Sequence, residues 1–455
     1  MARPTASAPH CSTLRETLVA RQAARESAAR SYAQTLPIAP VLASGAVVTG
    51  ADGRSYVDCL AGAGTLAIGH NHPEVIAALR STLDSGAPLQ VLDMITPDKD
   101  AFTAELLARL PCGLRDAARV HFCSPAGTDA VEAALKLARV ATGRHGVIAF
   151  SGAYHGMTLG AAAVSGSARA RWMFGAEGLG VTRLPFPYGY RCPFGVGAPL
   201  SAELSAHLLA TMLDDPSSGV AQPAAVILEV VQGEGGVIPA PDSWLRAVRA
   251  ITESRGVLLI VDEVQTGVGR TGTLWACERA GVTPDILVAA KAVGGGLPLA
   301  VIAYRPSLDV WAPGDHTGTF RGNTLAMVAG RVTLQVVTRQ RLAERAARLG
   351  AVLVEGLHRL AARHPMIGDV RGRGLMIGAE IVDPAGAADE LGARPAAPLL
   401  AAALQTAALR NGLIVELGGR AGAVLRLLPP LTLTDAQAQL VLDRLTTACA
   451  QVAAQ

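Results

Sequence analysis

Residues 257–272 read VLLIVDEVQTGVGRTG, and residues 285–300 read DILVAAKAVGGGLPLA. Each segment contains a continuous apolar run, which is typical of a strand buried on both faces of a parallel sheet. The first run ends at Asp262 and Glu263, and the second ends just before Lys291. Open α/β sheets bind their ligands at the carboxyl ends of such strands. These two strand ends therefore predict both the fold class and the position of a site.

Similar apolar runs alternate with helical patterns between about residues 100 and 305. They lie at residues 120–123, 147–150, 225–229, 257–262 and 286–290. Such alternation predicts an α/β fold, with a large domain built on a mostly parallel, doubly wound sheet. A smaller α+β domain is expected from both chain ends. The predicted parts are a flexible tail (1–11), an N-terminal helix and strands of the small domain (12–65), the large domain (66–325) and the C-terminal part of the small domain (326–455).

Two helices are expected outside the large domain. Residues 12–32 form a polar, Arg-rich helical stretch that suits a surface helix. Residues 325–363 carry one long helical pattern.

The composition suits a chain with a sizeable core. Half of the 455 residues are hydrophobic, 17% are charged and the formal net charge is +3, so neither nucleic acid nor an anionic membrane is indicated as a partner. No run of 18 apolar residues and no secretory signal are present. The seven cysteines are scattered without zinc-like spacing. We therefore expect reduced thiols, no metal site and a cytoplasmic location.

A third segment, HFCSPAGTDAVEAALKLAR (residues 121–139), places small residues between a strand and a helix. Ser124, Gly127 and Thr128 lie at the expected helix start. Free backbone N–H groups and the helix dipole favour an anion there, and a phosphate would fit. Taken alone, the segment favours an ordinary capped helix over a phosphate site.

The chain offers few candidates for a reactive amine, because only Lys99, Lys136 and Lys291 are lysines. Lys99 lies in a Pro-Asp-Lys-Asp turn, and Lys136 lies in an amphipathic helix where a lysine usually reaches solvent. Lys291 precedes three glycines in an uncharged segment. Desolvation there would lower its pKa and make the amine nucleophilic. Without the other segments, a surface lysine in a loop would explain it equally well.

A carboxylate at the end of a buried strand is costly unless a cation faces it, so Asp262 is expected to have a cationic partner. Glu263 is expected to face the opposite way, toward a structural partner. Residues 267–272, GVGRTG, also match G-x-G-x-x-G. That fingerprint must follow its strand tightly and open a helix. Neither condition is met here, which disfavours a dinucleotide-binding dehydrogenase.

Together these segments resemble the class III (ω-type) aminotransferases, which bind pyridoxal 5′-phosphate (PLP) and have PLP fold type I. The resemblance rests on DEVQTGVGRTG after the strand and KAVGGGLPLA around the lysine, and it covers about residues 40–435. It implies a cofactor in the large domain. Lys291 would form the Schiff base and shuttle protons, and Asp262 would pair with the pyridine nitrogen. A non-catalytic relative would be expected to lack this lysine.

The resemblance also implies roles for further residues. Gly127 and Thr128 would hold the cofactor phosphate, Tyr154 (in AYHGMT) would stack on the ring, and Gln265 would lie near the 3-hydroxyl. Thr319, in GTFRGN, resembles a threonine that reaches the phosphate from the neighbouring subunit. That role implies a homodimer, or a higher oligomer, with shared active sites.

Two residues concern the substrate. Arg426, in RLLPPL, matches the arginine that binds the α-carboxylate of glutamate or 2-oxoglutarate, a job that suits a planar guanidinium. Glu234, in QGEGG, matches the glutamate that covers this arginine when an ω-amino substrate is bound. A surface ion pair is the plain alternative for Arg426, which is one of 37 arginines.

Finer features resemble the diaminobutyrate–2-oxoglutarate aminotransferases. They are ESAARSY, SPAGTDAVEAALKLAR, YGYRCPFG and HTGTFRGNTLAM, together with small residues around Ala63, where ornithine-type relatives have an aromatic residue. The expected reaction moves an amino group between L-glutamate/2-oxoglutarate and aspartate 4-semialdehyde/L-2,4-diaminobutyrate by a ping-pong mechanism. The partners would be small amino acids and oxo acids. The alternatives are an ornithine, acetylornithine or 4-aminobutyrate aminotransferase, or a racemase or aminomutase of the same fold.

Overall fold

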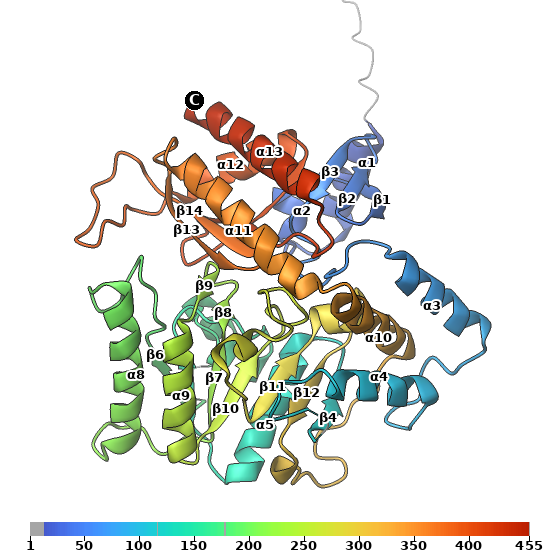
Figure 1. The fold of residues 1–455 in the computed structure, drawn as a ribbon, viewed down its shortest axis with the longest axis vertical. Coiled ribbons are helices and arrows are strands. Elements are labelled where there is room, and N and C mark those ends of the chain that lie inside the picture. Colours follow the sequence, from blue (N-terminus) through green and yellow to red (C-terminus); the bar gives the residue numbers. More distant parts are fainter. Residues whose placement is uncertain (1–12, 116, 177–178, 455) are drawn as a thin grey trace, which may run out of the picture.

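The computed structural model describes residues 13–115, 117–176 and 179–454, so the tail expected over residues 1–11 lies outside the described residues. At its centre is a seven-stranded sheet in the order β4-β12-β11-β10-β7-β5-β6 (Figure 1). β12 is antiparallel to both of its neighbours, and the other pairs are parallel. The mostly parallel sheet is thereby confirmed. Its strands are β4 (Arg119–Phe122), β5 (Val147–Phe150), β6 (Val181–Leu184), β7 (Ala225–Glu229), β10 (Leu258–Asp262), β11 (Ile286–Ala289) and β12 (Val301–Tyr304).

Helices cover both faces of this sheet, which explains why its strands are apolar throughout. Ile260 belongs to a core cluster with Val131 of α5 (Gly127–Thr142). Its neighbour Leu259 belongs to a second cluster with Trp244 of α9 (Asp242–Ser254). Successive side chains of a strand point to opposite faces, so each face is buried in its own core. Further helices of this part are α4 (Pro97–Leu107), α6 (Leu159–Val164), α7 (Ala168–Phe174) and α8 (Ala198–Asp214).

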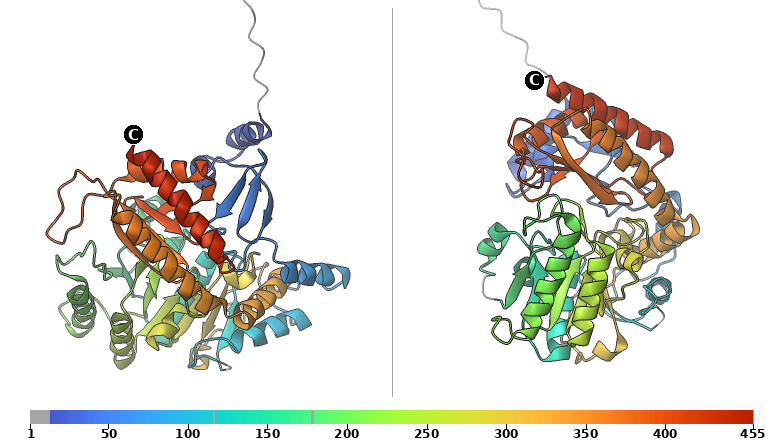
Figure 2. Two further views of the ribbon diagram at one scale, coloured as in Figure 1. Left: turned by 45° about the horizontal axis from the view of Figure 1, so that its top comes forward. Right: turned by 60° about the vertical axis from the view of Figure 1, so that its left-hand side comes forward.

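The two ends of the chain meet in a second, smaller layer above the large sheet (Figures 1 and 2). One sheet has the order β1-β2-β3-β15, in which the N-terminal β3 pairs with the C-terminal β15 through Val57 and Leu413. The other has the order β13-β14-β17-β16. The strands are β1 (Pro40–Ser44), β2 (Val47–Gly50), β3 (Ser55–Asp58), β13 (Ile367–Arg373), β14 (Met376–Ile381), β15 (Leu413–Ile414), β16 (Glu416–Gly418) and β17 (Val424–Leu427).

A short hairpin of β8 (Val231–Gln232) and β9 (Ile238–Pro239) lies on the side of the large sheet that faces the smaller layer (Figure 1). The remaining helices are α1 (Leu14–Arg25), α2 (Tyr32–Thr35), α3 (Pro73–Asp84), α10 (Thr324–Arg339), α11 (Leu342–Ala361), α12 (Pro398–Arg410) and α13 (Asp435–Ala453).

The single helix expected over residues 325–363 is wrong. α10 ends at Arg339 and α11 begins at Leu342, with Arg341 between them at φ 51°. That left-handed conformation costs about 1–2 kcal/mol in a non-glycine residue. The break lets α10 pack on α3 and α4 while α11 packs on β13 and α13. Neither Gly nor Pro marks this break, so the sequence pattern runs through it.

The expected N-terminal helix is shorter than residues 12–32. α1 begins after Thr13, whose side chain and that of Glu16 form a capping box, and it ends at Arg25. Among the helices of the described residues, none combines the length and the apolarity needed to cross a bilayer.

Candidate active site

A cavity of about 270 Å³ opens at the carboxyl ends of β10 and β11. It brings together residues that are up to 165 positions apart in the chain, from Ala126 to Lys291, because parallel strands end at one edge of the sheet. Most of the residues predicted from the sequence line it: Gly127, Thr128, Tyr154, Glu234, Asp262, Gln265 and Lys291. Arg426 and Thr319 lie outside this lining.

Lys291 follows the end of β11 by two residues and is partly buried. Its backbone has φ 53°, a strained conformation that recurs at functional sites. Burial lowers the pKa of its amine, and the carboxylates of Glu234 and Asp262 oppose that shift. The expected desolvation is therefore present, and it favours the neutral, nucleophilic form of the amine.

The glycines after Lys291 serve packing. Gly295 has φ 61°, and a Cβ atom there would lie 2.5 Å from the backbone of Ala329 in α10. The close approach of α10 holds the segment that carries the lysine.

Asp262 ends β10 with only 5% of its surface exposed. Its Oδ1 accepts from the Val264 N–H at 3.0 Å, and its Oδ2 lies 2.8 Å from Nδ1 of His155. Burial disfavours a charged His155, yet the hydrogen bond and charge of Asp262 raise the pKa of this imidazole overall. His155 was not among the residues predicted from the sequence. Its contact with Asp262 spans 107 residues, so no local pattern predicts it. The one sequence signal for His155 was its position directly after Tyr154.

Glu263 points away from this cavity, as expected. It accepts from the hydroxyl of Thr266 and, at 2.9 Å, from the backbone N–H of Cys277. Burial raises the pKa of Glu263 to about 7. Its partners lie in the turn after β10 and in the short helix Ala276–Ala280, and Glu263 itself does not line the cavity, which fits a structural role.

The N-terminus of α5 forms one wall. Its N-cap, Ala126, offers no side-chain acceptor, so the first N–H groups of α5 remain available to an anion. A Cβ atom on Gly127 would lie 3.1 Å from a methyl carbon of Val264, so a side chain there would fit only if Val264 shifted. The hydroxyl of Thr128 lies 2.8 Å from that of Thr158. Ser124 does not line the cavity; its N–H donates to Asp129 at 2.7 Å.

Tyr154 and Gln265 complete the lining. Tyr154 is 40% exposed, and its backbone N–H donates to Glu229 Oε2 at 3.0 Å. Burial raises the pKa of Glu229 to about 7. Gln265 Nε2 donates to the carbonyl of Ala63 at 3.2 Å, while its Oε1 is buried without a hydrogen-bond partner in the described chain.

Arg426 lies behind Glu234 and is fully buried. Its Nη1 and Nη2 bind the two oxygens of Glu234 at 2.8 and 3.0 Å, a bidentate pair. A second carboxylate, Glu416, binds Nη2 at 2.9 Å. The predicted pairing of Arg426 with Glu234 is therefore present in the structure, whereas Glu416 was not foreseen.

Thr319 lies on the wall of a different cavity of about 660 Å³, with His316 and Arg321. Its carbonyl accepts from Gln90 Nε2 at 2.5 Å. The structure thus does not bring Thr319 into the cavity of Lys291 within one chain.

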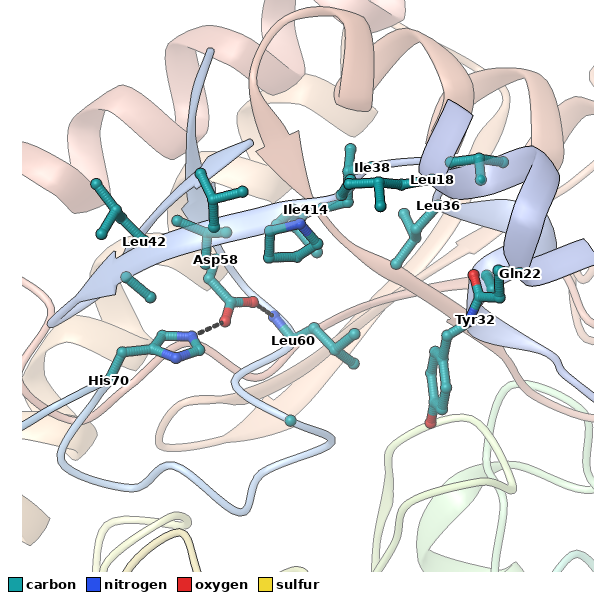
Figure 3. Close-up of a pocket in the computed structure, with 18 of the residues that line it drawn as sticks. Leu18, Gln22, Tyr32, Leu36, Ile38, Leu42, Asp58, Leu60, His70 and Ile414 are labelled. Carbon is teal, nitrogen blue, oxygen red and sulfur yellow. Dashed lines mark hydrogen bonds and ion pairs between the residues drawn. The ribbon is translucent and has the colours of Figure 1, made fainter. Parts of the chain in front are cut away.

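A larger cavity of about 750 Å³ lies beside α1, α2 and the β1–β3 sheet (Figure 3). It is mostly apolar, and its buried carboxylate, Asp58, is already bound by His70 Nε2 at 2.8 Å. Neither Lys291 nor Asp262 lines it. Size alone therefore does not make it the reactive site.

Comparison with known proteins agrees with this geometry. The family model for class III aminotransferases matches residues 27–449. Diaminobutyrate–2-oxoglutarate aminotransferases of Rhizobium meliloti and Haemophilus influenzae are 56% and 48% identical to the chain, covering 92% and 93% of it and 89% and 93% of the relatives.

Solved structures are also similar. An amine transaminase from an uncultivated Pseudomonas species, in the PLP-bound (internal aldimine) form, is 31% identical with a TM-score of 0.83, covering 94% of this chain and 98% of its own. The ornithine aminotransferase of Toxoplasma gondii ME49 is 29% identical with a TM-score of 0.81, covering 97% and 96%. The protein therefore belongs to the class III aminotransferase family.

Proposed function

We propose that this protein is a PLP-dependent transaminase that moves an amino group from L-glutamate to aspartate 4-semialdehyde, giving 2-oxoglutarate and L-2,4-diaminobutyrate, and that it catalyses the reverse reaction as well. The observation that carries the proposal is the pair of strand ends that face one cavity. A partly desolvated amine, Lys291, and a buried carboxylate, Asp262, both line it. The names of the bacterial relatives support the choice of substrates.

The residues of the cavity fit the cofactor. The uncapped start of α5 suits its phosphate, and Gly127 at this helix start presents only backbone to it. Asp262 would face the pyridine nitrogen, Tyr154 would cover the ring, and the unpartnered Oε1 of Gln265 would meet the 3-hydroxyl. Lys291 would hold the aldehyde carbon through its amine. Once bound, the group supplies an electron sink that acidifies the carbon carrying the substrate amine.

The chain's own residues then manage charge and protons. Lys291 takes a proton from the substrate carbon and returns one, acting as general base and then acid. Burial lowers the pKa of this amine, which favours the neutral form that a general base requires. His155 holds the carboxylate of Asp262 in place through a 2.8 Å contact. Asp262 would keep the ring nitrogen of the bound cofactor positively charged.

Arg426 and Glu234 would let one pocket accept two kinds of substrate. The guanidinium binds the α-carboxylate of glutamate or 2-oxoglutarate when Glu234 moves aside. Glu234 is the mobile partner because 37% of its side chain is exposed, whereas that of Arg426 is fully buried. For an amino group at the far end of the substrate, the bidentate pair stays closed. The two half-reactions alternate in a ping-pong sequence.

A homodimer with shared active sites is part of the proposal. Thr319 would reach the cofactor phosphate of the neighbouring subunit. Its position outside the Lys291 cavity of its own subunit supports this role. A cytoplasmic location is also proposed, on the basis of the scattered cysteines.

A substrate panel tests the proposed function. Purified holoenzyme is assayed with 2-oxoglutarate and each of four amines: L-2,4-diaminobutyrate, L-ornithine, N-acetylornithine and 4-aminobutyrate. The highest kcat/KM is expected for diaminobutyrate. If the kcat/KM for another amine were tenfold higher, that amine would be assigned as the substrate, and the reaction class would remain transamination.

A further inference from the structure

Glu416 is a buried carboxylate that the reaction described above does not use. It begins β16 and lies directly opposite Arg426 of β17 in the antiparallel register. Only 6% of its surface is exposed. Its Oε1 accepts from Arg426 Nη2 at 2.9 Å and from the hydroxyl of Tyr32 at 2.8 Å. Two strands and an N-terminal residue therefore fix its position.

The charges around Arg426 do not balance. One guanidinium faces two carboxylates, and Glu234 and Glu416 meet at the same nitrogen, Nη2, at 3.0 and 2.9 Å. The second oxygen of Glu416, Oε2, is buried and has no hydrogen-bond partner in the described chain. An unsatisfied buried carboxylate oxygen is costly, so a missing cation or donor is indicated.

Glu416 is also within electrostatic reach of the reactive amine. Burial raises the pKa of Glu416, while the charges of Arg426 and Lys291 lower it and that of Glu234 raises it further. In turn, the Glu416 carboxylate opposes the lowered pKa of Lys291. A positive group placed between the cavity and Glu416 would relieve the excess negative charge.

We propose that Glu416 recognises the second, non-reacting ammonium group of a diamino-acid substrate. The inference rests on the proposed function and deepens it. In L-2,4-diaminobutyrate the second amine lies on a carbon two bonds beyond the reacting one. From Lys291 it would extend toward Glu234, which lines the cavity, and toward Glu416, which shares Nη2 of Arg426 with Glu234. Glu416 binds this ammonium through Oε2, while Oε1 stays on Arg426 and Tyr32.

Tyr32 is the residue that keeps Glu416 in this orientation. Figure 3 shows it on the side of the large cavity opposite the Asp58–His70 pair. Burial and the charge of Glu416 raise the pKa of Tyr32 far above its usual range, so the hydroxyl remains a donor. The N-terminal segment thereby takes part in substrate selection.

A matched pair of substrates tests this role. L-2,4-diaminobutyrate and 4-aminobutyrate share the reacting amine and the carboxylate and differ only in the second ammonium. The ratio of their kcat/KM values, measured with saturating 2-oxoglutarate, is expected to fall at least about tenfold in Glu416→Gln. A purely structural role would lower both values together and leave the ratio unchanged, which would overturn the inference.

Two further variants make the result decisive. Asp285→Asn alters another buried carboxylate, which is paired with Arg249 at 2.7 Å and Arg305 at 3.1 Å and not with Arg426, and it should leave the ratio unchanged. If Glu416→Gln does not fold, Tyr32→Phe is the alternative variant, because it keeps the carboxylate and removes the hydroxyl that donates to its Oε1. The ratio should then fall about threefold. An unchanged ratio would refute the inference. A wild-type enzyme inactive on diaminobutyrate would refute the proposed function itself, and this inference with it.

Discussion

Glu234→Gln is expected to favour glutamate over the amine at the far end of a diamino acid. In the wild type Glu234 occupies both Nη atoms of Arg426, at 2.8 and 3.0 Å, and a substrate carboxylate must displace it. The amide keeps the shape and removes the charge. Arg426 would remain held by Glu416 at 2.9 Å, so the guanidinium should stay in position.

The magnitude follows from the exposure of the pair. A hydrogen bond to a charged group contributes about 1.5–3 kcal/mol when buried. The side chain of Glu234 is 37% exposed, so solvent screening reduces its contribution to about 1 kcal/mol. That corresponds to a KM for L-glutamate about fivefold lower than in the wild type. The KM for diaminobutyrate should not fall, because its amino end does not displace Glu234.

The assay is steady-state kinetics with each amino donor varied at a saturating oxo acid. Glu105→Gln is the control, since Glu105 of α4 pairs with Arg109 at 2.6 Å and does not line the cavity. An unchanged or higher KM for L-glutamate in Glu234→Gln would refute the assignment of Glu234 as the displaceable cover of Arg426.

Two further predictions concern the strand that ends in adjacent acids. Asp262→Asn should lower kcat about 100-fold, the equivalent of one charge-assisted hydrogen bond. The urea midpoint of unfolding should move little, because Asn can still accept from the Val264 N–H. Parallel losses of kcat and of the midpoint would indicate a structural role instead. For Glu263, the folded pKa of about 7 exceeds the ordinary 4.5, so the stabilisation is complete below about pH 4.5 and is lost as the pH rises through 7. The unfolding free energy of the wild type should therefore fall between pH 5 and pH 7.5, by at most about 3 kcal/mol from this group. In urea titrations, the unfolding free energy of Glu263→Gln should fall less over the same range. Equal falls in the two proteins would show that Glu263 does not titrate there.

The parts of the site that lie on regular strand ends were predictable. Asp262 and Lys291 follow apolar runs, and the rule that ligands bind at the carboxyl edge of a parallel sheet places them together. Gly127 and Thr128 could be found in the same way, from a strand that leads into a helix. These predictions need only local sequence patterns, because the sheet itself supplies the geometry.

The long-range contacts around the site were not predictable from the sequence. Tyr32 and Glu416 are separated by 384 residues, and no periodic pattern links a short N-terminal helix to a three-residue strand. His155 has the same difficulty, since it is one polar residue in a loop. The break at Arg341 was missed because its left-handed backbone is imposed by the packing of α10 and α11 on different layers.

The central claim is that Lys291 holds the cofactor through its amine. Because the chain has only three lysines, borohydride reduction of the protein with PLP followed by peptide mapping tests it directly. A single phosphopyridoxyl group is expected on Lys291, and Lys291→Ala should carry none and show no turnover. Modification confined to Lys99 or Lys136, or a colourless wild type that gains no adduct, would contradict the account.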